Sequence, residues 1–446
     1  MLRDSIRPYI SFAIASYNRS NLTYRLASDL LSNTDKRIEV LVVDDASSDD
    51  TLKNLEKIKD SRFKVFKHVK NMGPKMTWFD TYEQAQGEWV FCINDRDVIN
   101  TKYVAQLIDI LERLSAENVG FVVAGEKWLK TPTKDYILYE KGFETIEEFG
   151  LRNQHPTGQI FKRDCWIEIE NRKEYFMNDK YGIYPHGFIE TIMGNRYSGA
   201  YILFDICDME HYSDRMKLIP PSCVYKSQGK EYFLPSQRYK LLELMLDNVN
   251  LINDRKKIKE LTLSRYKKWF NSATIEYFYY MNNELVKFRY GYTDINISTE
   301  EIIAYGKEYV KSFREYLYDK NFNWINKEFM KTLGNLESKL MIQLADWKDV
   351  KNKEYLGADC NNIILYGAGR RGQKAIACGI APKYICDSSL DKIGKQLYGM
   401  TIKSFEDCEK LYDSNTVFLI TPINIDALIS IARQLLEKGY RYRFFV

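Results

Sequence analysis

Long apolar runs are absent from this sequence. No stretch of about 18 apolar residues, the shortest that spans a bilayer as a helix, occurs along its 446 residues. Residues 1–8 carry Arg3, Asp4 and Arg7 and lack the apolar core of a secretory signal peptide. We therefore expect a chain that neither spans a membrane nor enters the secretory route, and that works in the cytoplasm.

Closely spaced cysteines and a strong net charge are also lacking. The eight cysteines include no Cys-x-x-Cys pair, so neither a structural zinc site nor a redox dithiol is indicated, and we expect reduced thiols. The 65 basic and 61 acidic side chains leave a net charge of only +4. This balance gives no chain-wide field for a polyanion, so nucleic acid is not an expected partner.

The chain is too long for one ordinary core, and its composition, with 45% hydrophobic residues, is that of a globular protein. Changes in pattern predict three domains. We expect an α/β domain over residues 1–235, a helical domain over 236–350 and a small Rossmann-like α/β domain over 351–446. The helical prediction rests on dense Leu, Ile, Tyr and Lys without proline between Ser236 and Asp346.

Apolar runs and a helical pattern alternate in the first domain. Leu22, Leu26 and Leu30 predict a helix capped by Ser20 or Asn21. Short apolar runs predict strands at Tyr9–Ile14, Ile38–Val43, Phe63–Phe66, Trp89–Ile93 and Val119–Ala124. This alternation is typical of a largely parallel sheet, and after Gly125 we expect loops and short strands.

Polar segments follow three of the predicted strands, at 15–19, 44–51 and 94–97. Ligands of open α/β sheets bind beyond the carboxyl ends of the strands. Each segment alone is equally typical of a turn or a helix cap. Their recurrence at successive strand ends favours a binding site.

These segments resemble those of the inverting family 2 glycosyltransferases, which have the GT-A fold. The resemblance rests on Tyr17-Asn18, then Asp44-Asp45-Ala46-Ser47, then Asn71-Met72-Gly73 and Ala85-Gln86-Gly87 ahead of Asp95-Arg96-Asp97. It covers about the first 125 residues and becomes loose towards residue 225. It implies a bacterial enzyme of capsule or other surface-polysaccharide synthesis.

The resemblance also implies roles for individual residues. It assigns the donor to Ala15, Tyr17, Asp45, Lys75, Asp95 and Arg96, with Asp45 accepting the ring N–H of the base. It assigns a divalent cation, Mn²⁺ or Mg²⁺, to Asp95 and Asp97, and His211 is a further candidate ligand. Asn94 and Arg96 stand where the family usually has acids, so Arg96 either lies against the diphosphate or points into solvent.

An inverting transfer needs a general base, and Glu190 is the candidate. The Glu-Asp pair common in the family is not present here, and Asp179, Asp205 and Asp208 are rivals. Glu190 is also compatible with a purely structural place in the first turn of a helix. His155 is a candidate for contact with a sugar, as are several aromatic residues: Trp128, Trp166, Tyr181, Tyr184 and Tyr197.

Two further patterns lie outside the first domain. Seven basic residues against two acids between Asp254 and Lys268 predict either a surface for an anionic glycan or membrane, or a solvated helix face. After the predicted strand Ile363–Tyr366, a dinucleotide-type pattern places Gly367, Gly369, Gly372 and Asp387 as a candidate second nucleotide site. A structural or assembly role for that segment is the alternative.

The sequence thus predicts a glycosyltransferase that moves a sugar, with inversion, from a nucleotide-diphosphate donor to a capsular or other surface glycan. A UDP-sugar is the expected donor, and the acceptor glycan is either free or lipid-linked. Peripheral membrane contact and a homo-oligomer both remain open. One alternative is a nucleotide-sugar oxidoreductase or epimerase that uses the C-terminal glycines, although no Tyr-x-x-x-Lys is present there. The other is a non-catalytic nucleotide-sugar-binding scaffold.

Overall fold

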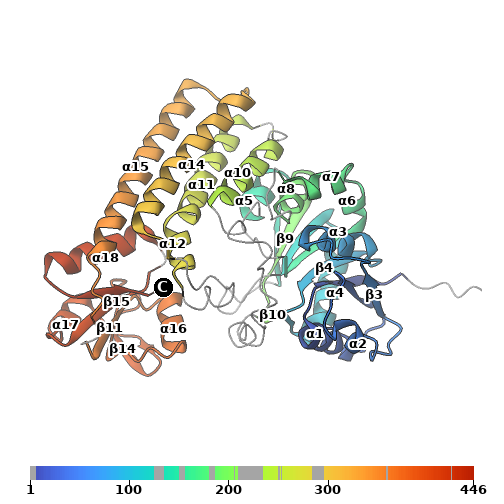
Figure 1. The fold of residues 1–446 in the computed structure, drawn as a ribbon, viewed down its shortest axis with the longest axis horizontal. Helices are drawn as coiled ribbons and strands as arrows, with labels where there is room; N and C mark the ends of the chain where they lie inside the picture. Colours follow the sequence, from blue (N-terminus) through green and yellow to red (C-terminus); the bar gives the residue numbers. More distant parts are fainter. Residues whose placement is uncertain are drawn as a thin grey trace, which may run out of the picture. The chain divides into compact units, whose positions relative to one another are not determined.

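The computed structural model describes residues 7–124, 135–149, 156–179, 186–204, 206–208, 235–249, 252, 254–283, 296–357, 360–422 and 424–445. The chain forms two compact units (Figure 1). The first comprises Met1–Trp269, Phe288–Thr293 and Tyr316–Ile325, and the second comprises Phe270–Lys287, Asp294–Glu315 and Asn326–Val446.

A mixed sheet of eight strands, in the order β3-β2-β1-β4-β8-β6-β9-β7, forms the centre of the first unit. Its first four strands are parallel, as predicted: β1 (Ile10–Ser16), β2 (Ile38–Asp44), β3 (Phe63–Lys67) and β4 (Trp89–Asn94). Every residue of β2 is buried, which suits a strand covered on both faces. The chain reverses its direction of growth between β1 and β4, and such switch points are where open α/β sheets bind ligands.

The second half of this sheet departs from the parallel prediction. β8 (Gln159–Lys162) runs antiparallel to both β4 and β6 (Val119–Ala124), and β7 (Tyr136–Tyr139) runs antiparallel to β9 (Ser198–Ile202). Apolar content predicts a buried strand but not its direction, which depends on the connection. A small second sheet pairs β5 (Val98–Ile99) with β10 (Cys207–Asp208).

Helices cover both faces of the parallel half. Leu26 and Leu30 of α1 (Ser20–Ser32) and six apolar residues of α4 (Val104–Ser115) share one core with Phe12 and Ile14 of β1. On the other face, Phe79 and Tyr82 of α3 (Pro74–Gln84) pack against the rings of Phe161, Trp166 and Phe176. Trp166 is therefore a core residue.

The predicted cap of α1 is wrong. The helix begins at Ser20, with Arg19 at the N-cap position and no capping bond from its side chain. Another loop supplies the acceptors instead: the Ser20 N–H donates to Asp49 (3.2 Å) and the Arg19 N–H to Thr51 Oγ1 (3.2 Å). Asp49 and Thr51 adjoin α2 (Thr51–Leu55), so the loop after β2 holds the start of α1.

The region after Gly125 contains more helix than predicted. Its described part includes α5 (Phe143–Phe149), α6 (Arg163–Ile167), α7 (Arg172–Met177) and α8 (His186–Arg196). These helices have 5 to 11 residues, and periodicity identifies helices reliably only over windows of about 11–18 residues.

Residues 236–350 are helical wherever they are described, apart from short connections. The helices are α10 (Pro235–Val249), α11 (Arg255–Ala273), α12 (Ile275–Met281), α14 (Thr299–Lys320) and α15 (Lys327–Asn352). Among the residues that the structure describes, no helix is both long and apolar enough to cross a bilayer. The domain boundaries at 235 and 350 remain predictions.

The second unit ends in a six-stranded sheet, β13-β14-β12-β11-β15-β16. Five strands are parallel, in the doubly wound order 3-2-1-4-5, and β13 (Gln396–Leu397), which follows β12 in the chain, joins antiparallel at the edge. The parallel strands are β11 (Asn362–Tyr366), β12 (Tyr384–Cys386), β14 (Met400–Lys403), β15 (Thr416–Ile420) and β16 (Tyr442–Phe444). The helices are α16 (Arg370–Ala377), α17 (Phe405–Glu409) and α18 (Ile425–Glu437).

Candidate donor site at the strand ends

The three polar segments meet at one edge of the first sheet. In the parallel register Ser16 is opposite Asp44, and Ala15 is opposite Asn94. The segments that follow β1, β2 and β4 therefore leave the sheet side by side. This is the convergence that the sequence predicted.

The loops after β1 and β2 are locked together by hydrogen bonds. The Asn18 side-chain oxygen accepts from the Ser48 N–H (2.8 Å), and the Asn18 N–H donates to Ser47 Oγ (2.8 Å). Asn18 and Ala46 both have positive φ, at 51° and 57°, a conformation that side chains other than Gly adopt uncommonly. Next to this lock, Tyr17 is 43% exposed and free to contact a ligand, while Ala15 is half-buried.

Asp45 is nearly enclosed by donors. Its Oδ1 lies 2.7 Å from His68 Nδ1 and accepts from the Met72 N–H at 2.7 Å, while its Oδ2 accepts from the Gly73 N–H at 2.9 Å. The residue is 3% exposed. Its carboxylate thus joins the end of β2 to the Asn71-Met72-Gly73 segment, which the sequence singled out without indicating that the two are in contact.

Asp95 and Asp97 follow β4 and are 5% and 3% exposed. Asp95 forms an ion pair with Arg19 (3.1 Å). Burial raises the pKa of Asp95, while the guanidinium groups of Arg19 and Arg96 oppose that rise. Arg96 is partly buried, and its guanidinium is close enough to Asp95 to lower the pKa of that acid. This position argues against the alternative that Arg96 only points into solvent.

Thr157 links the acids after β4 to β8, and no motif in the sequence pointed to this role. Its hydroxyl donates to Asp97 and accepts from the Asn94 N–H at 2.8 Å. Two residues further along, Gln159 donates from Nε2 to Glu190 Oε1 at 2.8 Å. The Thr157-x-Gln159 pattern therefore connects Asp97 to the predicted general base.

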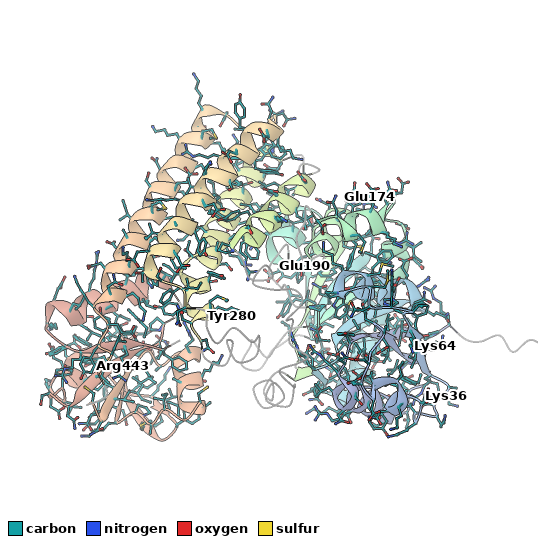
Figure 2. The ribbon with its side chains drawn as sticks, viewed as in Figure 1. Lys36, Lys64, Glu174, Glu190, Tyr280 and Arg443 are labelled. Carbon is teal, nitrogen blue, oxygen red and sulfur yellow. The ribbon has the colours of Figure 1, made fainter. Side chains whose placement is uncertain are left out.

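Glu190 lies on α8 and is fully buried (labelled in Figure 2). Its place is the fifth residue of the helix, beyond the first turn. The rival Asp179 is exposed and forms an ion pair with Lys75 at 3.0 Å, and Lys75 itself is the second residue of α3. Asp208 is in β10, whereas Asp205, His155, His211, Trp128, Tyr181 and Tyr184 lie outside the described residues.

The donor set suits a hard divalent cation. Asp95 and Asp97 supply two carboxylates from one turn, and oxygen ligands of this kind are those that Mg²⁺ and Mn²⁺ prefer. Within the described ranges no group of three or more His, Cys, Asp and Glu side chains could hold a metal ion. A cation bound here would take its remaining ligands from water or from donor phosphates.

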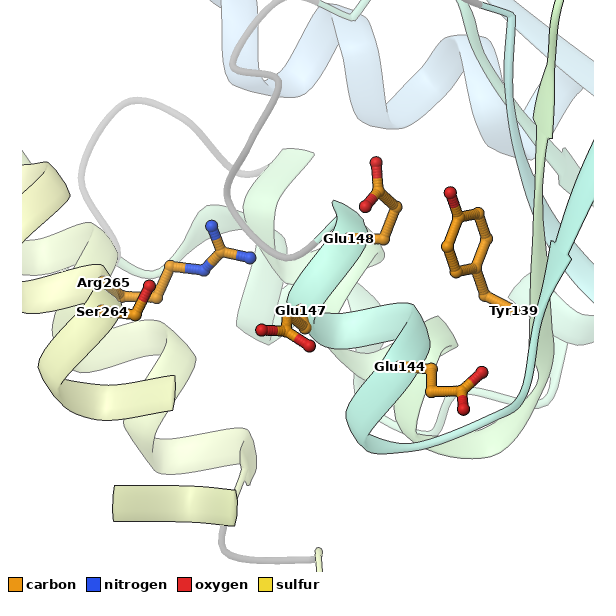
Figure 3. A pocket seen from close by; sticks show the side chains of 6 residues that line it. All are labelled: Tyr139, Glu144, Glu147, Glu148, Ser264 and Arg265. Carbon is orange, nitrogen blue, oxygen red and sulfur yellow. The ribbon is translucent and has the colours of Figure 1, made fainter. Parts of the chain in front are cut away.

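A separate hollow of about 440 Å³ lies between α5 and α11 within the first unit (Figure 3). Glu147 of α5 points toward Arg265 of α11 across it, and Glu144 and Glu148 of α5 also line it. Arg265 is 7% exposed, and Lys257 lies over the Phe143 ring at 5.1 Å. Part of the predicted basic surface thus faces this acidic helix, and Arg255, Lys256 and Lys267 are among its exposed members.

In the C-terminal sheet the glycine pattern forms the turn between β11 and α16. Gly367 has φ +114°, and a Cβ at Gly372 would lie 2.0 Å from the Gly367 carbonyl oxygen, so both positions need glycine. Asp387 accepts from the Ala368 N–H (2.7 Å) and the Ser389 N–H (2.9 Å) and lies 3.2 Å from Lys392 Nζ. These contacts give Asp387 a role in holding the turn, and nucleotide binding here remains a prediction.

Residues 11–168 match the family model "Glycosyl transferase family 2". This region is a family 2 glycosyltransferase domain with the GT-A fold. The match contains all three strand-end segments and Thr157.

Two curated relatives match part of this chain. The chain is 31% identical over 103 residues to the Escherichia coli UDP-Glc:alpha-D-GlcNAc-diphosphoundecaprenol beta-1,3-glucosyltransferase WfaP, covering 23% of this chain and 41% of the relative. It is 23% identical over 200 residues to the Campylobacter jejuni GalNAc(5)-diNAcBac-PP-undecaprenol beta-1,3-glucosyltransferase, covering 40% and 64%. The chain thus spans less than two thirds of either relative.

Among solved structures, S. aureus TarS 1–349 in complex with UDP-GlcNAc aligns over 79% of this chain and 95% of its own, at 14% identity and a TM-score of 0.48. A likeness of this size is too low to bear on the site or the substrate.

Proposed function

We propose that the chain transfers a sugar from a nucleotide-diphosphate donor to a surface glycan or lipid-linked glycan acceptor, with inversion at the sugar carbon. Among nucleotide sugars, a UDP-sugar is the first candidate for the donor. The observation that supports this most is the convergence of three polar segments at the carboxyl edge of a family 2 domain. The buried carboxylates of Asp45, Asp95 and Asp97 are its charged centre.

The roles proposed for individual residues come from the family resemblance, and the place of these groups at the strand ends supports them. Tyr17, Ala15 and Asp45 bind the nucleoside, and Arg96 with Lys75 offsets charge on the diphosphate. Asp95 and Asp97 hold the divalent cation, which supplies electrostatic stabilisation of the leaving diphosphate when it is bound. Arg19 and Thr157 orient those two carboxylates through the contacts described above.

Glu190 is the general base in this proposal, oriented by Gln159. Glu190→Gln should abolish transfer while leaving donor binding intact. Asp179→Asn, which changes an exposed acid, should retain transfer, and the reverse result would make Asp179 the base.

For the acceptor, two named relatives act on sugars linked to undecaprenol diphosphate. We propose an acceptor of this lipid-linked class, presented at the cytoplasmic face of a membrane. The exposed basic residues of α11 are available to an anionic surface or diphosphate. A homo-oligomer and a second nucleotide at the C-terminal glycine turn are compatible with this proposal and are not needed for it.

The deciding experiment measures free nucleoside diphosphate released from UDP-, GDP- and CMP-sugars with Mn²⁺ or chelator, for wild type, Asp97→Ala and Gly369→Asp. Metal-dependent release that only Asp97→Ala abolishes supports the transferase. Donor binding without turnover would instead support a scaffold. Reduction of NAD that Gly369→Asp removes would support the oxidoreductase.

A further inference from the structure

His68 stands at the end of β3, between two carboxylates. Its Nδ1 lies 2.7 Å from Asp45 Oδ1, and its Nε2 lies 2.8 Å from Asp80 Oδ2 on α3. The imidazole is 6% exposed, and the Phe66 ring meets it edge-on at 5.8 Å. Neither the predicted site nor the family match assigns this histidine a role.

The protonation state of His68 follows from its two partners. A carboxylate accepts hydrogen bonds and does not donate them, whereas a neutral imidazole has only one N–H. Both short contacts can be hydrogen bonds only if the ring carries a proton on each nitrogen. The charged groups that face the ring are Asp45 from the end of β2 and Asp80 from α3. Burial lowers the pKa of His68, but the bonds to these two carboxylates outweigh it, and the net shift is upward.

The contact with His68 determines which carboxylate oxygen of Asp45 remains available to a ligand. A carboxylate oxygen can accept about two hydrogen bonds. Oδ1 receives His68 and the Met72 N–H, whereas Oδ2 receives the Gly73 N–H and keeps room for one further donor. The ring thus fixes the carboxylate with Oδ2 as the oxygen open to a ligand N–H, and it fixes the Met72–Gly73 backbone through the same group.

We propose that His68, as an imidazolium bridging Asp45 and Asp80, is a positioning residue that sets the Asp45 carboxylate for the N–H of the donor's base. This inference rests on the proposed function, because it assumes that Asp45 meets the nucleoside. It predicts that loss of the proton weakens nucleotide binding without slowing the transfer step. Neutral His68 would leave one nitrogen lone pair facing a carboxylate oxygen, and Asp45 would lose its fixed orientation.

The test measures donor KM, kcat and the dissociation constant for UDP and GDP with Mn²⁺, from about pH 6 to pH 9, a range that contains histidine titration. We expect KM and the dissociation constant to rise about tenfold as pH increases, while kcat changes little. His68→Gln, which cannot donate to both acids, should have the weaker binding at every pH and lose the pH dependence.

A second variant separates this role from a structural one. Asp80→Asn leaves Asp45 intact and removes one of the two groups that favour the imidazolium, so the rise in KM should move to lower pH. Asp60→Asn is the matched control, because Asp60 pairs with Arg62 at the start of β3, away from His68, and should leave the profile in place. If His68→Gln does not fold, the pH profiles of KM for wild type and Asp80→Asn still test the role of His68.

The outcomes distinguish the two proposals. If the enzyme turns over with a KM that does not depend on pH, the proposed role of His68 is wrong and the transferase proposal stands. The same holds if Asp80→Asn leaves the pH profile of KM unchanged. Absence of both nucleotide binding and diphosphate release at every pH overturns the proposed function, and the inference falls with it.

Discussion

Thr157→Val is the sharpest test of how the acids after β4 are held. Valine keeps the size of threonine and removes only the hydroxyl, which donates to Asp97 and accepts from the Asn94 N–H. Thr157 is 6% exposed and Asp97 is 3% exposed, so water has little access to replace the lost bonds. The substitution therefore releases a buried carboxylate and leaves a backbone N–H without its acceptor.

The two losses differ in kind and in size. A hydrogen bond to a charged group contributes about 1.5–3 kcal/mol, and a buried N–H left unpaired costs about 1–3 kcal/mol. Because the loop can relax, we expect a loss of about 3 kcal/mol in the free energy of unfolding, at the low end of the sum. Loss of a group that orients a metal ligand typically weakens metal affinity by about 10–100-fold. We expect the Mn²⁺ concentration for half-maximal activity to rise by that factor.

The assay is diphosphate release against Mn²⁺ concentration, with urea unfolding of the same samples. Thr145→Val is the matched control: Thr145 is also buried, and its hydroxyl donates to the Tyr139 and Glu140 carbonyls, away from the acids. The control should lose stability and keep its Mn²⁺ dependence. If Thr157→Val and Thr145→Val show the same Mn²⁺ dependence, Thr157 does not orient a metal-binding acid.

Other predictions concern the histidine bridge and the C-terminal turn. Because the pKa of His68 is raised in the folded state, its stabilisation should be complete below the pKa of an unfolded histidine and disappear as pH rises through the folded value. The difference in unfolding free energy between wild type and His68→Gln should therefore shrink from pH 6 towards pH 9, and a difference that grows with pH would contradict the imidazolium. Gly372→Ala should destabilise the C-terminal sheet by about 1–3 kcal/mol or more, since its Cβ would overlap the Gly367 carbonyl oxygen. Gly369→Ala, whose Cβ meets nothing within 4 Å, should change the melting temperature far less, and equal effects of the two would refute the turn geometry.

The parallel half of the first sheet and the meeting of its polar segments were predictable from the sequence. A strand buried on both faces, such as β2, has an almost continuous apolar run, and parallel strands bring their carboxyl ends to one edge. The C-terminal strands and the glycine turn were predictable for the same reason. The local sequence pattern was sufficient to predict a strand or turn wherever the residues of that element alone determine its structure.

The partners of the acids could not be predicted in this way. Thr157, Gln159 and His68 act through contacts with residues 60, 31 and 23 positions away, and no local pattern encodes such pairings. The start of α1 was predicted wrongly for the same reason, because its acceptors come from the loop after β2. The short helices α5 to α8 and the antiparallel β8 depend on packing in the assembled sheet.

The attachment of Thr157 to the turn after β4 has a consequence for how such enzymes diversify. The Asn94 N–H and the Thr157 hydroxyl meet across 63 positions of chain, and the intervening described elements include α4, β6, β7 and α5. Insertions or deletions in that interval would leave the contact in place as long as β8 still pairs with β4. Descendants could thus acquire new acceptors through this interval while inheriting an unchanged arrangement of the acids.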